Sequence, residues 1–188
     1  MKKKIKTISL SVLLLIVVSV PKTYAQPTEN PDFASALNKI IAESTHDFNS
    51  LKGEVFLSTK DSSWLSTEKL PGYDDASVNM ILLGGEKRYS WESTMMKTTD
   101  SVAALKKYSE IAKMIMNMKL DCCSLVKKEL STNAFYQTDI NYWTVASLNS
   151  GKDKDLKGLS ITLKLRHPYF MHDDYMVVLS IDNIFKGI

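Results

Sequence analysis

The stretch VNMILLGGEKRYSW, residues 78–91, decides the fold class that we predict for this chain. Runs of apolar and aromatic residues at 78–83 and 88–91 lie on either side of the pair Gly84-Gly85. Adjacent glycines readily adopt the positive φ angles that a two-residue hairpin turn needs. The stretch therefore predicts an antiparallel β-hairpin.

Further strands are predicted on both sides of this hairpin. Residues 158–166 alternate apolar and polar side chains, which is the pattern of a strand with one buried face. Short turns between strands favour antiparallel pairing. The other predicted strands, recognised by their β-branched and aromatic composition, are 54–57, 64–65, 142–146 and 175–181.

An amphipathic helix is predicted before the first group of strands. Apolar residues recur at three- and four-residue spacing between residues 33 and 51, with an interruption near Ser44. Glycine is the residue that most often ends a helix. We therefore expect Gly53 to close this helix.

A second helix is predicted between the two groups of strands. Thr99 or Asp100 can cap its first turn, and its apolar stripe continues to about Leu120. Residues 122–130 fit either a continuation of the helix or a loop followed by a short strand. This ambiguity leaves the start of the second group of strands open.

The element order predicts an α+β fold. One helix and about three strands are followed by a second helix and about three more strands. Such a sheet buries one face by packing two helices against it. We expect a single globular α+β domain over residues 26–188, in which two helices cover one face of an antiparallel sheet.

Residues 1–25 have the organisation of a secretory signal peptide. Four lysines precede an apolar run at 8–20, and Ala25 provides the small residue of a cleavage site. The run is short for a bilayer span, which needs about 20 residues. We expect cleavage after Ala25, export to a periplasm or out of the cell, and no membrane span after cleavage.

Loss of this leader changes the sign of the net charge. The whole chain carries 24 basic and 21 acidic residues, for a net charge of +3. Five lysines and no acidic residue leave with residues 1–25, so 19 basic residues remain and the net charge becomes −2. Nucleic-acid-binding domains carry a basic surface. We therefore expect no nucleic-acid partner.

The two cysteines, Cys122 and Cys123, are adjacent. Consecutive Cα atoms lie about 3.8 Å apart, below the usual disulfide range of about 4.4–6.8 Å. An ordinary disulfide between them is excluded, whereas a vicinal disulfide with a distorted peptide link is possible. Two reduced, buried thiols are the simpler interpretation.

Sulfur-bearing side chains also suggest a soft-metal site. Met114, Met118 and Cys122 are spaced so that a continuous helix would carry them on one face. Thioether and thiolate ligands suit Cu(I). Copper binding is therefore an alternative function, although methionines at this spacing also serve as core residues. No other metal and no organic cofactor is expected.

No catalytic motif is present in the sequence. Neither G-x-S-x-G nor H-E-x-x-H occurs, and there are only three histidines, His46, His167 and His172. A small hydrolase remains a further alternative. It would need a nucleophile and a histidine within hydrogen-bond reach.

An aromatic turn is the most suggestive feature for binding. Tyr169, Phe170, Met171 and His172 lie between two predicted strands, where a loop with apolar side chains needs a packing partner or a ligand. We therefore expect a non-enzymatic binding module for an envelope protein, a peptide or a small apolar ligand.

Overall fold

A computed structural model of the chain describes residues 31–58, 61–129, 138–149, 151, 154–168 and 174–183. The proposed signal peptide lies outside these residues. Three short 3-10 turns accompany the regular elements: Ser44–His46, Asn49–Leu51 and Lys154–Gly158. The helices and strands are α1 (Pro31–Glu43), β1 (Lys52–Ser58), β2 (Ser62–Ser66), β3 (Ala76–Leu83), β4 (Glu86–Thr98), α2 (Ser101–Asn117), β5 (Cys123–Glu129), β6 (Thr138–Leu148), β7 (Leu159–Arg166) and β8 (Tyr175–Asn183).

The strands form one antiparallel sheet of eight strands in the order β1-β2-β3-β4-β8-β7-β6-β5. The N-terminal half, residues 31–98, and the C-terminal half, residues 101–183, repeat the order helix and four strands. The last strands of the two halves, β4 and β8, pair at the centre of the sheet. The predicted α+β class is confirmed, with four strands in each half instead of about three.

The predicted hairpin forms the connection from β3 to β4. Leu83 pairs with Glu86 across the two-residue turn, and the register continues without interruption to Ala76 and Ser93. The φ angles of the turn glycines are 63° and 88°. Both angles are strained for residues with a side chain, which explains why glycine occupies both positions.

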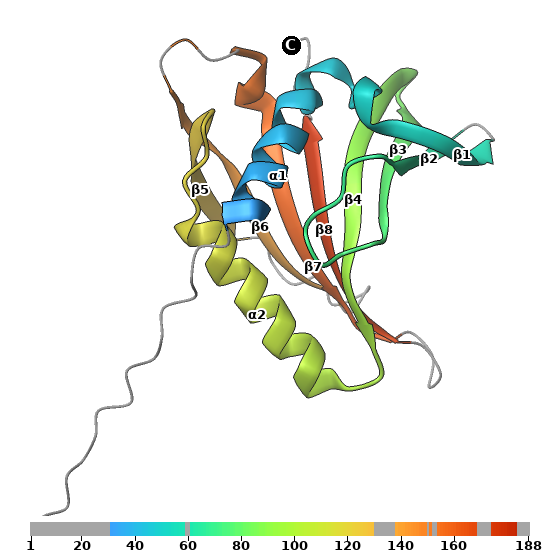
Figure 1. The fold of residues 1–188 in the computed structure, drawn as a ribbon, viewed down its shortest axis with the longest axis vertical. Coiled ribbons are helices and arrows are strands. Elements are labelled where there is room, and N and C mark those ends of the chain that lie inside the picture. The colour runs from blue at the N-terminus through green and yellow to red at the C-terminus, as the bar shows by residue number, and fades with distance from the viewer. Residues whose placement is uncertain are drawn as a thin grey trace, which may run out of the picture.

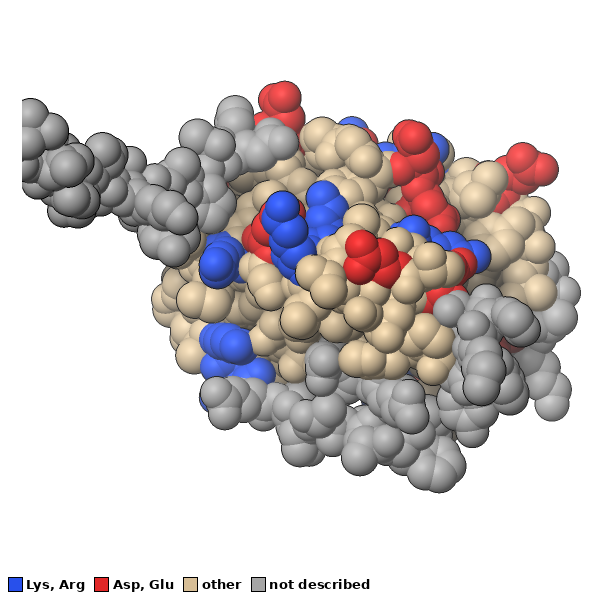
Figure 2. Space-filling view, turned by 90° about the horizontal axis from the view of Figure 1, so that it is seen from below, with Lys and Arg blue, Asp and Glu red and all other residues tan. Residues whose placement is uncertain are grey.

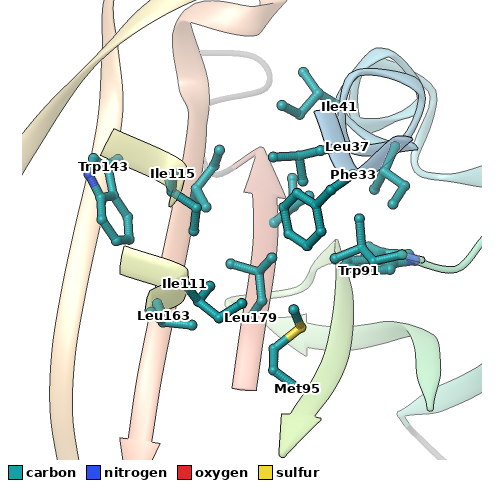
Figure 3. Close-up of a cluster of buried hydrophobic side chains, with 14 of the residues drawn as sticks. Phe33, Leu37, Ile41, Trp91, Met95, Ile111, Ile115, Trp143, Leu163 and Leu179 are labelled. Carbon is teal, nitrogen blue, oxygen red and sulfur yellow. The ribbon is translucent and has the colours of Figure 1, made fainter. Parts of the chain in front are cut away.

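Both helices pack on one face of the sheet, as predicted (Figure 1). Alternate residues of a strand point to this face. The core residues of the sheet come mainly from β3, β4, β7 and β8, whereas no described side chain of β1 belongs to the core. Apolar side chains of α1 and α2 meet the strand residues in the interior (Figure 3). The labelled members of this core are Phe33, Leu37, Ile41, Trp91, Met95, Ile111, Ile115, Trp143, Leu163 and Leu179.

The first helix is shorter than predicted. It ends at Glu43, and two 3-10 turns carry the chain to Leu51. Asp47 and Phe48 have positive φ angles of 57° and 53°, which an α-helix cannot contain. Gly53 does not close the helix; it lies in β1, where an added Cβ would be 2.8 Å from the carbonyl oxygen of Leu65.

The second helix begins as predicted. The side chain of Asp100 accepts hydrogen bonds from the backbone N–H groups of Val102 and Ala103, at 2.8 and 3.1 Å. The helix ends at Asn117 rather than near Leu120, because Met118 already has an extended backbone. The ambiguous segment after it is a strand, β5, at the edge of the sheet.

Charged side chains of both signs are scattered over the face seen in Figure 2, most of which consists of other residues. Lysines and arginines lie beside aspartates and glutamates there. No helix within the described residues has the length and apolar character needed to cross a membrane.

Candidate binding site

A cavity of about 660 Å³ opens where the C-terminal end of α2 meets β5 and β6. Its volume is within the range of ligand pockets, about 300–1,000 Å³. Apolar side chains from all three elements line it, together with two lysines. The lining residues are Ile115, Met116, Met118, Lys119, Leu120, Cys123, Ser124, Leu125, Val126, Lys127, Trp143 and Asn149.

The strand register explains why Trp143 belongs to the wall of this cavity. Trp143 of β6 pairs with Lys127 of β5 on one side and with Ile161 of β7 on the other. Directly paired residues project to the same face of a sheet. Ile161 is fully buried, so this is the face that the helices cover. Trp143 therefore lies between the central core and the edge strand.

The indole N–H of Trp143 is a buried donor without an acceptor. Trp143 is 1% exposed, and its Nε1 has no hydrogen-bond partner in the part of the chain that the structure describes. In Figure 3, this nitrogen lies on the side of the ring turned away from Ile115. Leaving a buried donor unpaired costs about 1–3 kcal/mol. Any acceptor that reaches this atom would remove this cost.

The rim of the cavity combines exposed apolar and cationic groups. Met116 is 59% exposed and Val126 is 39% exposed. Lys119 and Lys127 are also exposed, one after the end of α2 and one on β5. An apolar molecule with a negatively charged group would find contacts of both kinds here.

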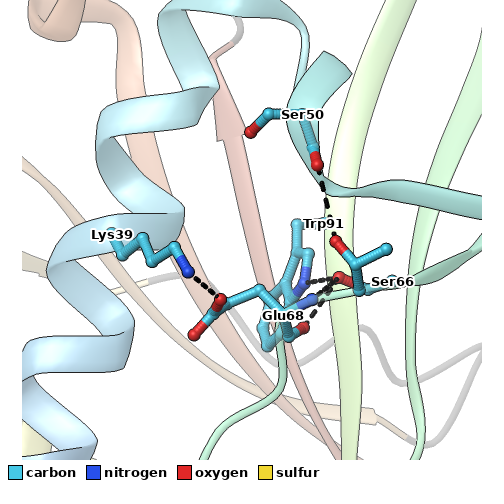
Figure 4. A network of polar contacts seen from close by, with 6 residues as sticks. Lys39, Ser50, Ser66, Glu68 and Trp91 are labelled. Atoms are coloured by element: carbon cyan, nitrogen blue, oxygen red, sulfur yellow. Dashed lines mark hydrogen bonds and ion pairs between the residues drawn. The ribbon is translucent and has the colours of Figure 1, made fainter.

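The second buried tryptophan, Trp91, is fully satisfied. Its Nε1 donates to the hydroxyl of Ser66 at 2.9 Å, and that hydroxyl donates to the carbonyl oxygen of Glu68 at 2.7 Å. The Glu68 carboxylate pairs with Lys39 of α1 (Figure 4). The Trp91 donor therefore has an acceptor within the protein, whereas the Trp143 donor has none among the described residues.

The structure separates the residues of the predicted copper site. Met114 is half-buried within α2, Met118 follows the last turn of the helix, and Cys122 lies in the loop before β5. Met118 lines the cavity described above, while Cys122 lines a different cavity. The helical face that would align all three ends at Asn117. Copper binding by these residues stays a prediction.

A polar cluster lies where the two halves of the sheet meet. The Ser180 hydroxyl donates to the Glu92 carboxylate at 2.8 Å, and Lys164 Nζ lies 3.6 Å from the same oxygen. Burial raises the pKa of the nearby Asp182 to about 6; Lys164 opposes this shift and Glu92 adds to it.

This cluster does not have the features of a hydrolase site. Ser180 is 1% exposed, and its hydroxyl contacts Glu92 and Lys164 rather than an imidazole. Lys164 is paired with the Glu92 carboxylate, and it donates to the Ser180 hydroxyl rather than accepting from it. In the described residues, no three His, Cys, Asp or Glu side chains group as metal ligands. The cluster is therefore best understood as part of the sheet.

The aromatic turn predicted to bind a partner lies outside the described residues. It comprises Tyr169, Phe170, Met171 and His172. Its neighbours are described: the rings of His167 and Tyr175 pack edge to face with centroids 5.6 Å apart. The binding role of the turn stays a prediction.

Sequence reasoning placed Trp143 in a strand but missed the cavity beside it. The cavity depends on β5, and residues 122–130 could not be assigned from their pattern. The sequence pattern does not single out Lys127, because its place opposite Trp143 follows only from the strand register. The only hints of this site in the sequence are Lys119, Lys127 and Trp143, which lie within or near the unassigned segment 122–130.

Comparison with protein families, with curated proteins and with solved structures finds no match to this chain. The candidate site therefore has to be interpreted from its own geometry and chemistry.

Proposed function

We propose that this protein is an exported, non-enzymatic binding protein for a small apolar anion, which is a hydrocarbon or aromatic body carrying a carboxylate. The observation that carries the proposal is the buried, unpaired indole N–H of Trp143 in the wall of a cavity of about 660 Å³. Ligand pockets typically combine apolar walls with a few polar groups that fix orientation. This cavity offers that combination.

Each part of such a ligand has a counterpart in the cavity. Leu125, Met118 and the Trp143 ring provide apolar contact for the body. The indole N–H provides a hydrogen bond to a carboxylate oxygen. Lys119 and Lys127 provide positive charge at the rim. A cation with the same apolar body would lack both of the last two interactions.

Export is part of this proposal and rests on the leader-like residues 1–25. A protein in a periplasm or outside the cell would meet such ligands as free solutes or as components released from membranes. The protein would then act as a carrier or a sensor, because no catalytic group has been identified beside the cavity.

The test is calorimetric titration of the mature protein with decanoate. We expect saturable binding of decanoate and no binding of decyltrimethylammonium, which has the same chain length and the opposite charge. Trp143→Phe should weaken decanoate binding by about tenfold or more, because it removes a hydrogen bond to a charged group. Trp64→Phe, at a half-buried tryptophan outside the cavity, is the matched control.

The lysines can be tested in the same way. Lys127→Gln should weaken decanoate binding by a few-fold, as expected for a solvent-exposed ion pair. Lys113→Gln changes an exposed lysine of α2 that does not line the cavity, and it should have no effect. Absence of decanoate binding, or equal affinity in the wild type and Trp143→Phe, would contradict the proposal.

A further inference from the structure

The loop that carries the two cysteines is held by hydrogen bonds on two sides. Asn149, after β6, donates its backbone N–H to the carbonyl oxygen of Cys122 at 2.8 Å and its side-chain amide to those of Leu120 and Asp121 at 3.3 and 2.9 Å. The backbone N–H of Asp121 donates to the side chain of Asn38 in α1 at 3.0 Å. The backbone of this loop therefore has little freedom to move its side chains apart.

The two thiols within this loop contact each other. The sulfur atoms of Cys122 and Cys123 are 2.6 Å apart, and both residues are buried. An S–S bond has a length of about 2.05 Å. Bond formation therefore requires a small approach of the two sulfur atoms, together with distortion of the peptide link between the two residues.

Each cysteine faces a different cavity. Cys122 lines a cavity of about 500 Å³ together with Asn38 and His46. Cys123 lines the cavity proposed for the ligand. The two thiols can therefore be approached from two different cavities, with Cys122 approached from the one that does not include Trp143.

We propose that Cys122 and Cys123 are a modification site that forms a vicinal disulfide by thiol–disulfide exchange with an external disulfide. This inference goes beyond the proposed ligand binding and does not depend on it. A bond between adjacent residues is strained, and strained disulfides are more easily reduced than structural ones. The modification is therefore reversible and responds to the redox state of the surroundings.

The exchange has two steps. The thiolate of Cys122 attacks one sulfur of the external disulfide, and the other sulfur leaves as a thiolate. The thiolate of Cys123 then attacks the Cys122 sulfur of this mixed disulfide and releases the second external thiolate. Two cysteine thiols are oxidised, one external disulfide is reduced to two thiols, and the two cysteine protons pass to the leaving thiolates.

The environment of the two thiols favours this order of attack. The hydrogen bond to Cys122 and burial both raise the pKa of Cys123. We therefore assign the first attack to Cys122. Its bonding to the external sulfur removes the thiol–thiol hydrogen bond, so Cys123 can lose its proton and act as the resolving thiol.

The test uses oxidised glutathione as the external disulfide. The mature protein is exposed to it in the folded state, then unfolded, treated with N-ethylmaleimide and digested with trypsin. Cleavage after Lys119 and Lys127 gives a peptide of residues 120–127 that contains both cysteines. We expect this peptide to be about 2 Da lighter than its reduced form and to carry no maleimide.

Single variants identify the two roles. In Cys123→Ser, the glutathione adduct on Cys122 should persist, because no resolving thiol is left. In Cys122→Ser, little adduct should form on Cys123. A wild-type peptide that carries two maleimides, or glutathione on both cysteines, would overturn the proposal even if neither variant folds.

Discussion

Trp91 and Trp143 are both buried, at 0% and 1% exposure, yet their surroundings differ. Trp91, in the N-terminal half, donates to Ser66 within a network that continues through Glu68 to Lys39. Trp143, in the C-terminal half, has a donor without an acceptor among the described residues and lines a cavity. The buried indole donor of the N-terminal half is paired within the protein, whereas that of the C-terminal half is unpaired among the described residues.

This difference shows how a repeated arrangement of elements can separate stability from binding. Both halves place one helix and four strands in the same order. A satisfied buried donor contributes to stability, while an unsatisfied one reduces stability until a partner arrives. A ligand that pairs with the Trp143 donor would therefore gain more binding free energy at the cavity beside β5 and β6 than at a region whose buried donors are already paired.

The largest predicted effect tests whether the two halves act as one unit. Asp182 lies at the seam, and its pKa is raised to about 6. The folded state therefore retains a proton that the unfolded state releases between about pH 4 and pH 6, so stability falls as pH rises through this range. Asp182→Asn should remove this loss. The change that it causes in the free energy of unfolding should therefore be more favourable at pH 7 than at pH 4, by up to about 3 kcal/mol.

Urea unfolding followed by circular dichroism at both pH values measures this effect. Asp74→Asn, at an exposed position of the β2–β3 connection, is the control. A single transition with the expected pH dependence supports a shared seam. Two separate transitions would mean that the two halves unfold independently, which would contradict a shared seam.

A smaller effect distinguishes the two tryptophans directly. Trp91→Phe removes the hydrogen bond that the indole N–H donates to Ser66. Trp143→Phe removes no hydrogen bond within the described residues. With similar loss of ring volume, Trp91→Phe should destabilise the protein by about 1–2 kcal/mol more than Trp143→Phe. Urea unfolding at one pH measures the difference. A larger loss for Trp143→Phe would mean that its donor is satisfied in the free protein.

The smallest effect concerns the helix beside the cavity. Asp100→Ala removes the N-cap of α2, at the end far along the helix from the cavity, and should cost about 1 kcal/mol of stability. Decanoate affinity of the folded protein should stay the same. Thr99→Ala, at the neighbouring exposed position, is the control. A loss of affinity equal to that of Trp143→Phe would show that the cavity depends on the whole helix.

Much of the fold could be predicted from local patterns. Gly84-Gly85 identified the central hairpin, because few other residues tolerate its backbone angles. Asp100 identified the start of α2 through its side chain. The alternation at 159–165 identified β7, whose inward residues are buried.

The end of the first helix could not be predicted in this way. Phe48 and Leu51 are buried at helical spacing, but Phe48 lies between the two 3-10 turns and Leu51 ends the second one. Neither Asp47 nor Phe48 is a glycine, so their positive φ angles have no signal in the sequence. Tertiary burial of Phe48 holds a conformation that local preference disfavours.

The candidate site was harder to predict because it depends on long-range pairing. The cavity forms only when β5 adds to the edge of the sheet and the chain leaves the helix at Met118. The unpaired donor of Trp143 is a consequence of this packing. Residue spacing carries no information about such a missing acceptor.

The central claim is that a ligand's acceptor completes the Trp143 donor, and the indole region of a ¹H–¹⁵N spectrum during decanoate titration tests it most directly. The three tryptophans, Trp64, Trp91 and Trp143, give separate indole signals that single Phe variants assign. We predict that the Trp143 signal moves downfield as binding saturates, while the Trp91 signal stays in place. A Trp143 signal that does not move would contradict the account.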